Sequence, residues 1–375
     1  MFAAAAPVTS LLQHLSAGTC LTDLPPDALL HIAKCGSRSE RELGSMLVVF
    51  CSVHQALRLM LAEHMSRVRA DHADELLRDA FALMKAPHAQ EERAQSITSL
   101  NLAQSFGGPR PSMALARAIR VCGSLTSIDL SRNKLTSFGR DLSGLQSVAS
   151  AIAESSLLTR LDLSVNRLGA EGSRIIADCI SKSSSLIELN LYLNFLGPAG
   201  ALAISDGVAS SKSIRELDLS ANKMGPWGAK AIADGIARSG LVCLDLSDNN
   251  LTNNGKDVTG IRAIAAALAI SPSLEELNLA GNSIGPSGAE ALAAGMAVSQ
   301  KLSWIDLSHN VLCGVDAIGR GTHIVEGINA LAEALGGRDT ITHLDVRNNA
   351  LDDMARQTLR DLASSRQTFA LHMYP

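Results

Sequence analysis

The stretch Leu125-Thr-Ser-Ile-Asp-Leu-Ser-Arg-Asn-Lys-Leu135 decides the fold of this 375-residue chain. Its pattern is Leu-x-x-Leu-x-Leu-x-x-Asn-x-Leu, in which Ile or Met replaces Leu at some positions. The further copies are residues 158–168, 186–196, 214–224, 241–251, 274–284, 302–312 and 341–351. A pattern that returns at a near-constant spacing is the signature of a repeat protein, so the period predicts the architecture before any single residue is considered.

The spacing inside one copy predicts a strand followed by a helix. In residues 214–239, Leu217 and Leu219 alternate with Asp218, which is the rhythm of a half-buried strand. The segment 225–228, Gly-Pro-Trp-Gly, then breaks the strand and opens a helix, where we expect Trp227 to pack on the neighbouring helix. The apolar residues that follow recur at helical spacing. Neither element can bury its apolar face alone, so the units must stack.

One asparagine recurs in every copy. A side-chain amide can bond open backbone groups, so these residues predict a ladder of satisfied turns along the stack. The ladder asparagines are Asn133, Asn166, Asn194, Asn222, Asn249, Asn282, Asn310 and Asn349.

The segment 161–173, Leu-Asp-Leu-Ser-Val-Asn-Arg-Leu-Gly-Ala-Glu-Gly-Ser, resembles the ribonuclease-inhibitor-like class of leucine-rich repeats. The resemblance covers residues 97–375. It implies an α/β fold, a curved horseshoe solenoid with parallel strands on the concave side and helices on the convex side. The atypical segments 97–102 and 368–373 fit end units that close the open core.

Variation in repeat length is confined to one loop. The distance from the ladder asparagine to the glycine that opens the helix is 6 residues in four units, but 11, 11 and 17 in the other three. The long loops 136–143, 252–259 and 312–326 must therefore emerge on one rim. They are either surface insertions that the fold tolerates or loops that bind a partner. Their candidate contact residues are Arg140, Asp141, Lys256, Asp257 and Arg320.

Two columns of side chains are expected on the concave face. The first contains Ser127, Arg160, Glu188, Glu216, Cys243, Glu276, Trp304 and His343, and from it we select Glu188 and Glu216 as partner-binding candidates. The second contains Asp129, Asp162, Asn190, Asp218, Asp245, Asn278, Asp306 and Asp345. The second column is either repeat consensus or an acidic stripe for a basic partner.

One unit departs from the pattern with Tyr192-Leu-Asn-Phe195, in a chain poor in aromatic residues. Clustered exposed aromatic side chains mark contact sites, so Tyr192, Leu193 and Phe195 form a candidate patch, unless Phe195 packs beneath the rim loop. A second candidate patch consists of Trp304 and His309 with His343 and Arg347 two units further on.

Residues 1–96 lack the repeat and are expected to be helical. The segment 24–57 resembles an F-box, a module that docks a substrate receptor onto a ubiquitin-ligase adaptor. The resemblance implies adaptor docking by Leu24, Pro25, Leu29 and Ile32. The tryptophan usual near its end is missing. The alternative is a plain helical cap, and residues 58–95 are expected to form a helical lead into the solenoid.

Composition limits the class of function. Hydrophobic residues make up 46% of the chain and aromatic residues 3%, so the core must be aliphatic. The net charge of −4, with acids and bases interspersed, argues against nucleic-acid binding, which needs a basic face. No apolar run approaches the roughly 20 residues of a membrane span. Residues 1–7 lack the basic region of a secretory signal, and the seven cysteines form no close pairs. We therefore expect a cytoplasmic protein, with the nucleus as the alternative.

The sequence contains no phosphate-binding loop, no His-Glu-x-x-His and no Cys-x-x-Cys pair. We therefore expect no enzyme activity, no cofactor and no metal site, and a monomeric protein-interaction scaffold that binds its partner on the concave face and rim. The first alternative is an F-box-like substrate receptor of a cullin ubiquitin ligase. The second is a RanGAP-like GTPase regulator, which the repeat class suggests by analogy of fold alone.

Overall fold

The structure is a computed structural model that describes residues 98–373, apart from 104–111, 113–114, 117–118, 121, 123, 137–138, 316–320 and 338. The described residues belong to one compact unit, Ala94–Pro375. The helical region expected over residues 1–96 lies outside them, as do the F-box-like segment 24–57 and its docking residues Leu24, Pro25, Leu29 and Ile32.

The described residues contain ten short strands in one open sheet, and every strand pairs in parallel with the strand of the next unit. The central residue of each strand is apolar and points into the core, as Leu189 and Leu217 do. The strands are β1 Ser99–Asn101, β2 Ser127–Asp129, β3 Arg160–Asp162, β4 Glu188–Asn190, β5 Glu216–Asp218, β6 Cys243–Asp245, β7 Glu276–Asn278, β8 Trp304–Asp306, β9 His343–Asp345 and β10 Ala370–His372.

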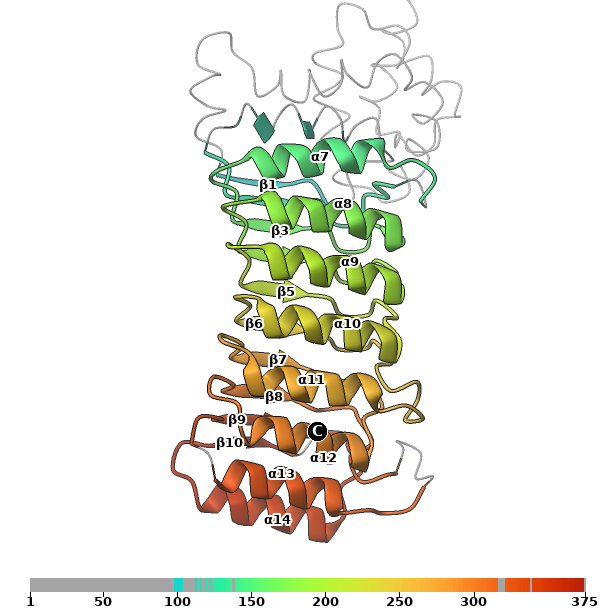
Figure 1. Cartoon of the computed structure of the whole chain (residues 1–375). Coiled ribbons are helices and arrows are strands. Elements are labelled where there is room, and N and C mark those ends of the chain that lie inside the picture. The colour runs from blue at the N-terminus through green and yellow to red at the C-terminus, as the bar shows by residue number, and fades with distance from the viewer. Residues whose placement is uncertain are drawn as a thin grey trace, which may run out of the picture. The chain divides into compact units, whose positions relative to one another are not determined.

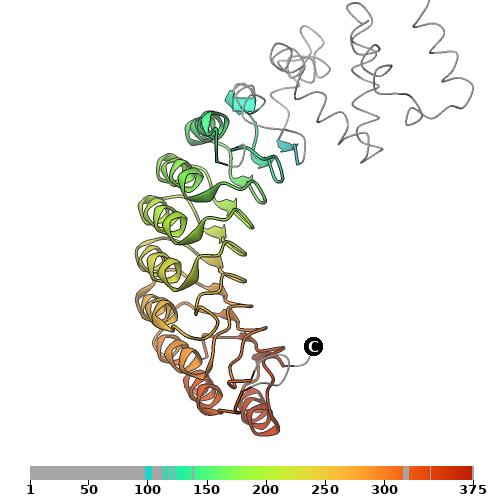
Figure 2. The same cartoon turned by 90° about the vertical axis from the view of Figure 1, so that its right-hand side faces the viewer.

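Helices follow the strands and cover the outer side of the sheet (Figure 1). Seen from the end of the strands, the units form an arc with strands inside and helices outside (Figure 2). The helices are α7 Ser143–Glu154, α8 Gly169–Lys182, α9 Gly197–Ser210, α10 Gly225–Arg238, α11 Thr259–Ile270, α12 Pro286–Met296, α13 Glu326–Gly336 and α14 Asp353–Ser364. The expected curved α/β solenoid is confirmed. Each of these helices is too short or too polar to span a bilayer.

The asparagine ladder holds the inner turns together. All eight ladder asparagines are buried. The Asn222 Oδ1 atom accepts the backbone N–H of Asn194, and its Nδ2 atom donates to the carbonyl oxygens of Leu191 and Leu219, each at 2.9 Å. Residues on both sides of the asparagine adopt positive φ, for example Ala221 at 55° and Lys223 at 57°. The turn thereby directs its backbone groups at the amide of the next unit.

Glycines let neighbouring helices approach closely on the outer side. A Cβ atom added to Gly207 of α9 would lie 2.7 Å from the carbonyl oxygen of Ala177 in α8. Gly235 of α10 faces Ser205 of α9 in the same way, at 2.8 Å from its hydroxyl oxygen. Small residues at these positions therefore set the distance between helices, because a side chain there would collide with the preceding helix.

Candidate functional site

The parallel register brings the first column of inner-face residues side by side. Glu188 of β4 pairs with Glu216 of β5, and Cys243 of β6 pairs with Glu276 of β7. The Arg160 guanidinium lies 2.5 Å from the Glu188 carboxylate, so Glu188 is partly neutralised by its neighbour. Glu216 and Glu276 are exposed and form no ion pair within the described part of the chain. The middle of the inner face is therefore acidic.

The second column has a structural role in every unit. Each Asp or Asn accepts the backbone N–H two residues later through its Oδ1 atom, as Asp218 does from Ser220 at 2.8 Å and Asn190 from Tyr192 at 2.9 Å. These bonds shape the turn after the strand and account for the near-uniform column as repeat consensus. The carboxylates still add negative charge. Burial, with the nearby charges of Asp245 and Asp162, raises the pKa of Asp218, against hydrogen bonds from Ser220 that lower it.

Cys243 lies within this acidic surface. Burial raises the pKa of its thiol to about 12, and the neighbouring carboxylates of Glu276, Glu216 and Glu275 add to the shift. The thiol is therefore protonated at neutral pH, which makes it a poor nucleophile.

The aromatic patch of the β4 unit is exposed. Tyr192 stands where most units hold serine and keeps 39% of its surface accessible, while Phe195 keeps 44%. Phe195 does not pack beneath a rim loop. Instead, the Nζ atom of Lys223 lies 5.0 Å from the centre of its ring. Leu193, with φ of 53°, is half-buried between them.

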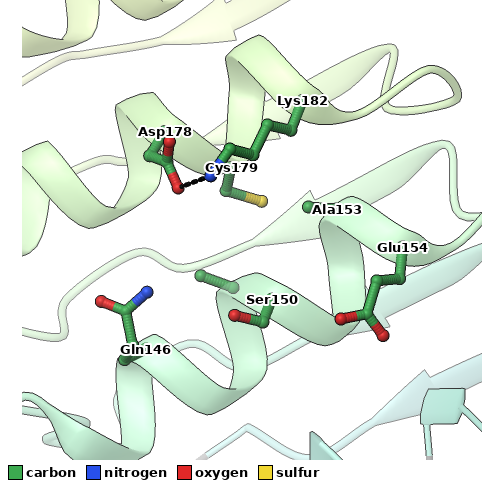
Figure 3. Close-up of a pocket in the computed structure, with 8 residues that line it drawn as sticks. Gln146, Ser150, Ala153, Glu154, Asp178, Cys179 and Lys182 are labelled. Atoms are coloured by element: carbon green, nitrogen blue, oxygen red, sulfur yellow. Dashed lines mark hydrogen bonds and ion pairs between the residues drawn. The ribbon is translucent and has the colours of Figure 1, made fainter.

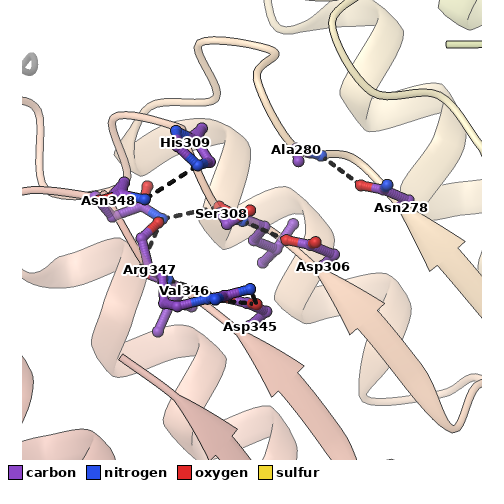
Figure 4. A network of polar contacts seen from close by, with 11 residues as sticks. Asn278, Ala280, Asp306, Ser308, His309, Asp345, Val346, Arg347 and Asn348 are labelled. Carbon is purple, nitrogen blue, oxygen red and sulfur yellow. Dashed lines mark hydrogen bonds and ion pairs between the residues drawn. The ribbon is translucent and has the colours of Figure 1, made fainter. Parts of the chain in front are cut away.

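The second patch lies in adjoining units rather than two units apart, because Trp304 of β8 and His343 of β9 are register partners. Trp304 is half-buried and His343 is exposed. The His309 Nε2 atom lies 3.0 Å from Asn348 Nδ2, and the Arg347 guanidinium binds the buried Asp345 carboxylate at 2.6 Å (Figure 4). The Arg347 guanidinium is therefore paired within its own turn, which reduces the positive charge it can offer to a partner.

The two patches are separate surfaces. Tyr192 follows β4, whereas the second patch belongs to β8 and β9, with strands β5, β6 and β7 between them in the sheet. Glu216 and Glu276 lie on that intervening stretch. A partner that contacts both patches must therefore cover the acidic middle of the inner face.

The long loops project from one edge of the solenoid, the right-hand edge in Figure 1. The described residues of loops 136–143 and 252–259 form equivalent hydrogen bonds. The Gly139 and Gly255 backbone N–H groups bond the Thr136 and Thr252 hydroxyls. The carboxylates of Asp141 and Asp257 accept bonds from Ser143 and Thr259 within their own loops. The side chains of Arg140 and Lys256 are exposed, as are those of Asp141, Asn253 and Asn254. Arg320 lies outside the described residues.

Trp227 contradicts its expected packing role. Its side chain is 74% exposed at the start of α10, and the Nζ atom of Lys230 lies 5.9 Å from the centre of its ring. The sequence carried a signal for this, because the equivalent position one unit earlier is Ala199, which leaves no requirement for a large residue.

A Gly-x-Ser-x-Gly sequence at residues 281–285 is a product of the repeat, although the same pattern marks the nucleophile of many hydrolases. Its second residue is the ladder asparagine Asn282, which is fully buried. Ser283 has φ of 54°, close to the 57° of Lys223 at the same place in another unit. Among the described residues, no group of three His, Cys, Asp or Glu side chains is placed to hold a metal ion.

A cavity of about 220 Å³ lies between α7 and α8 (Figure 3). Cys179 occupies the position of Gly207 and Gly235 in the next two helices, and its side chain lines this cavity. Burial raises the pKa of the Cys179 thiol to about 12. The cavity contains none of the residues selected from the sequence. Its lining is Gln146, Ala149, Ser150, Ala153, Glu154, Asp178, Cys179 and Lys182.

The repeat pattern matches a known family description, Leucine Rich repeat, over residues 154–173, 210–233 and 271–293. The chain contains leucine-rich repeats. Its structure is similar to that of the leucine-rich repeat-containing protein LegL7 from Legionella pneumophila, with 22% identity, coverage of 73% of this chain and 81% of that one, and a TM-score of 0.48.

A chain of the Rad7 and Elc1 complex of yeast is similar over 92% of this chain and 91% of its own length, with 13% identity and a TM-score of 0.38. No curated protein sequence matches the leucine-rich repeat chain.

Proposed function

We propose that this leucine-rich repeat chain is a non-catalytic protein-interaction scaffold that binds a partner on its concave face and strand-end rim. The pair Tyr192 and Phe195 carries the proposal. Both side chains are exposed by roughly two fifths, at 39% and 44%, on a turn fixed by the buried Asn194. Large aromatic side chains held rigidly at a surface lose little entropy on binding, so they make efficient anchors.

The concave face supports the same proposal. Parallel register holds its side chains in fixed columns, and stacked repeats present such columns as an extended surface. The exposed carboxylate of Glu216 lies on the strand beside the aromatic unit, and that of Glu276 lies two strands further on. They give the surface a charge that selects among partners. Trp304 and His343 add a second contact region at the C-terminal end.

A quantitative pull-down from native lysate tests the proposal. Wild type is compared with Tyr192→Ala/Phe195→Ala and with the control Ile270→Ala, which removes a 69% exposed apolar side chain at the end of α11. We expect the double variant to recover a specific partner about tenfold less well, and the control to recover it as wild type does. Equal recovery by all three proteins would count against the proposal.

Two alternatives are tested beside it. The F-box-like receptor, which rests on residues 24–57 alone, requires a ubiquitin-ligase adaptor among the captured proteins and its loss in Leu24→Ala/Pro25→Ala. The GTPase regulator requires that the purified chain stimulates GTP hydrolysis by a small GTPase. Adaptor recovery that is unchanged by the first variant argues against the receptor, and no stimulation argues against the regulator.

A further inference from the structure

The rim between the two equivalent loops has an unusual surface. Loops 136–143 and 252–259 flank three units whose turns carry no insertion, and we call the strand-end edge of these units the short-loop rim. Two of the three units carry the exposed side chains of Phe195 and Trp227. Both residues lie where a strand ends and a helix begins. The structure gives neither a packing role, since Trp227 is 74% exposed and Phe195 44%. Large apolar side chains that stay exposed to solvent are typical of a contact site.

Each aromatic ring of the short-loop rim lies beside a lysine. Lys223 Nζ is 5.0 Å from the Phe195 ring centre, and Lys230 Nζ is 5.9 Å from the Trp227 ring centre. Within the described part of the chain, neither ammonium group pairs with a carboxylate. A cation over an aromatic face forms a contact that strengthens when a partner excludes water.

Each flanking loop presents one exposed cation beside an aspartate. Arg140 and Lys256 are exposed at equivalent places, while the neighbouring Asp141 and Asp257 carboxylates are bound within their own loops. Glu171, at the start of α8, pairs with Arg174. Asp248 is the exposed acid nearest the second loop in sequence. Because hydrogen bonds from Ser143 and Thr259 leave the Asp141 and Asp257 carboxylates ionised, the two loops add no net charge. The positive charge of the rim is therefore that of Lys223 and Lys230, in contrast to the acidic concave face formed by Glu216 and Glu276.

We propose that the short-loop rim docks an acidic segment of a partner protein that carries at least one large apolar side chain. The partner's carboxylates approach Lys223 and Lys230, and its apolar side chain displaces water from Phe195 and Trp227. This inference rests on the proposed scaffold function. Of the two surfaces proposed there, the concave face and the strand-end rim, it specifies the chemistry of the partner at the rim. A basic segment is disfavoured here, because it would meet the ammonium groups of Lys223 and Lys230.

Tryptophan fluorescence of the full-length chain tests this inference. The chain has two tryptophans, so Trp304→Phe leaves Trp227 as the only reporter. The probes are short synthetic peptides rich in Glu and Asp that contain Leu and Phe at varied positions. The comparison peptides have Lys in place of every acid. We expect the acidic peptides to shift Trp227 emission to shorter wavelength, with an affinity that falls as salt is added.

Charge-reversal variants locate the binding. Lys223→Glu/Lys230→Glu should weaken the acidic peptides by about tenfold or more, whereas Lys212→Glu, at the opposite edge of the β5 unit, should leave their affinity unchanged. Three results would overturn the inference. They are no emission shift up to about 1 mM acidic peptide, equal binding of the basic peptides, and equal loss in the Lys212 control. If a lysate partner still depends on Tyr192 after any of these results, the proposed scaffold function stands without this inference.

Discussion

The side-chain oxygen of Asn222 accepts the backbone N–H of Asn194, one unit earlier, at 2.9 Å. The same oxygen also accepts the N–H of Leu196, and the amide nitrogen reaches back to the Leu191 carbonyl oxygen of the earlier unit. Because both atoms of the amide act across the boundary between units, Asn222 couples its own turn to the turn of the preceding unit.

We expect Asn222→Ala to lower the free energy of unfolding by about 2–5 kcal/mol, since it leaves several buried backbone groups without a partner. Chemical denaturation of the purified chain measures this loss. The exposed Asn329 of α13 provides a control as Asn329→Ala, which should leave the free energy of unfolding nearly unchanged. A loss below about 0.5 kcal/mol for the ladder variant would show that water replaces the amide.

Gly207→Ala should destabilise the chain by about 1–3 kcal/mol, because the new methyl group would meet the Ala177 carbonyl oxygen at 2.7 Å. Gly336→Ala is the control, since a Cβ there meets its nearest neighbour, a Leu362 methyl carbon, at 4.0 Å. The control should be neutral or slightly stabilising. Thermal unfolding compares the two variants, and equal midpoints would contradict the close approach of α8 and α9.

Asp218→Asn should stabilise the chain at neutral pH. Asp218 has a raised pKa in the folded protein, so its ionised form destabilises the fold, and that cost lasts at every pH above the raised value. Replacing one of two like charges in register should gain about 0.2–1 kcal/mol. Asn278 already donates from this column to Asp245 at 2.8 Å.

The pH dependence provides the check on that prediction. As pH falls through the raised pKa of Asp218 toward the ordinary pKa of an aspartate, wild type takes up a proton and the advantage of Asp218→Asn should shrink. Denaturation midpoints measured at several pH values follow this difference. An advantage that is constant across the range would contradict the assigned cause.

Cys243 should react slowly with iodoacetamide near pH 8, at least tenfold more slowly than an unperturbed thiol, because its pKa lies at about 12. Mass spectrometry of the peptide that contains Cys243 follows the rate separately from the other cysteines. Glu276→Gln should accelerate the reaction, since it removes a carboxylate that disfavours the thiolate. An unchanged rate in that variant would show that the local negative charge is weaker than inferred.

The sequence predicted those features that the repeat period controls. An asparagine stands at the position of Asn222 in every copy, so its role in the ladder followed from the spacing. The extra residues of loops 136–143 and 252–259 fall at the same point of the repeat, so both loops were expected at one edge. Features that depend on packing between units were harder to predict. The exposure of Trp227 depends on how α10 lies against α9, which a pattern within one unit does not specify.

The candidate site was predicted only in part. Tyr192 and Phe195 were recognisable because they interrupt a column of small or polar residues, and the structure confirms their exposure. The placement of Trp304 beside His343 followed from the repeat order, because copies 302–312 and 341–351 are consecutive, and the expected separation of two units was wrong. The internal pairing of Arg347 with Asp345 had no sequence signal, since it reflects a side-chain rotamer within one turn.

Photo-crosslinking in native lysate tests the scaffold claim most directly. Tyr192→p-benzoylphenylalanine places a reactive group on the proposed contact surface, and Met354→p-benzoylphenylalanine places it on α14, where Met354 is 69% exposed. We predict a discrete crosslinked partner from position 192 that is absent from position 354 and is lost when Phe195→Ala is added. No specific crosslink from position 192, or the same products from both positions, would contradict the claim that this face binds a partner.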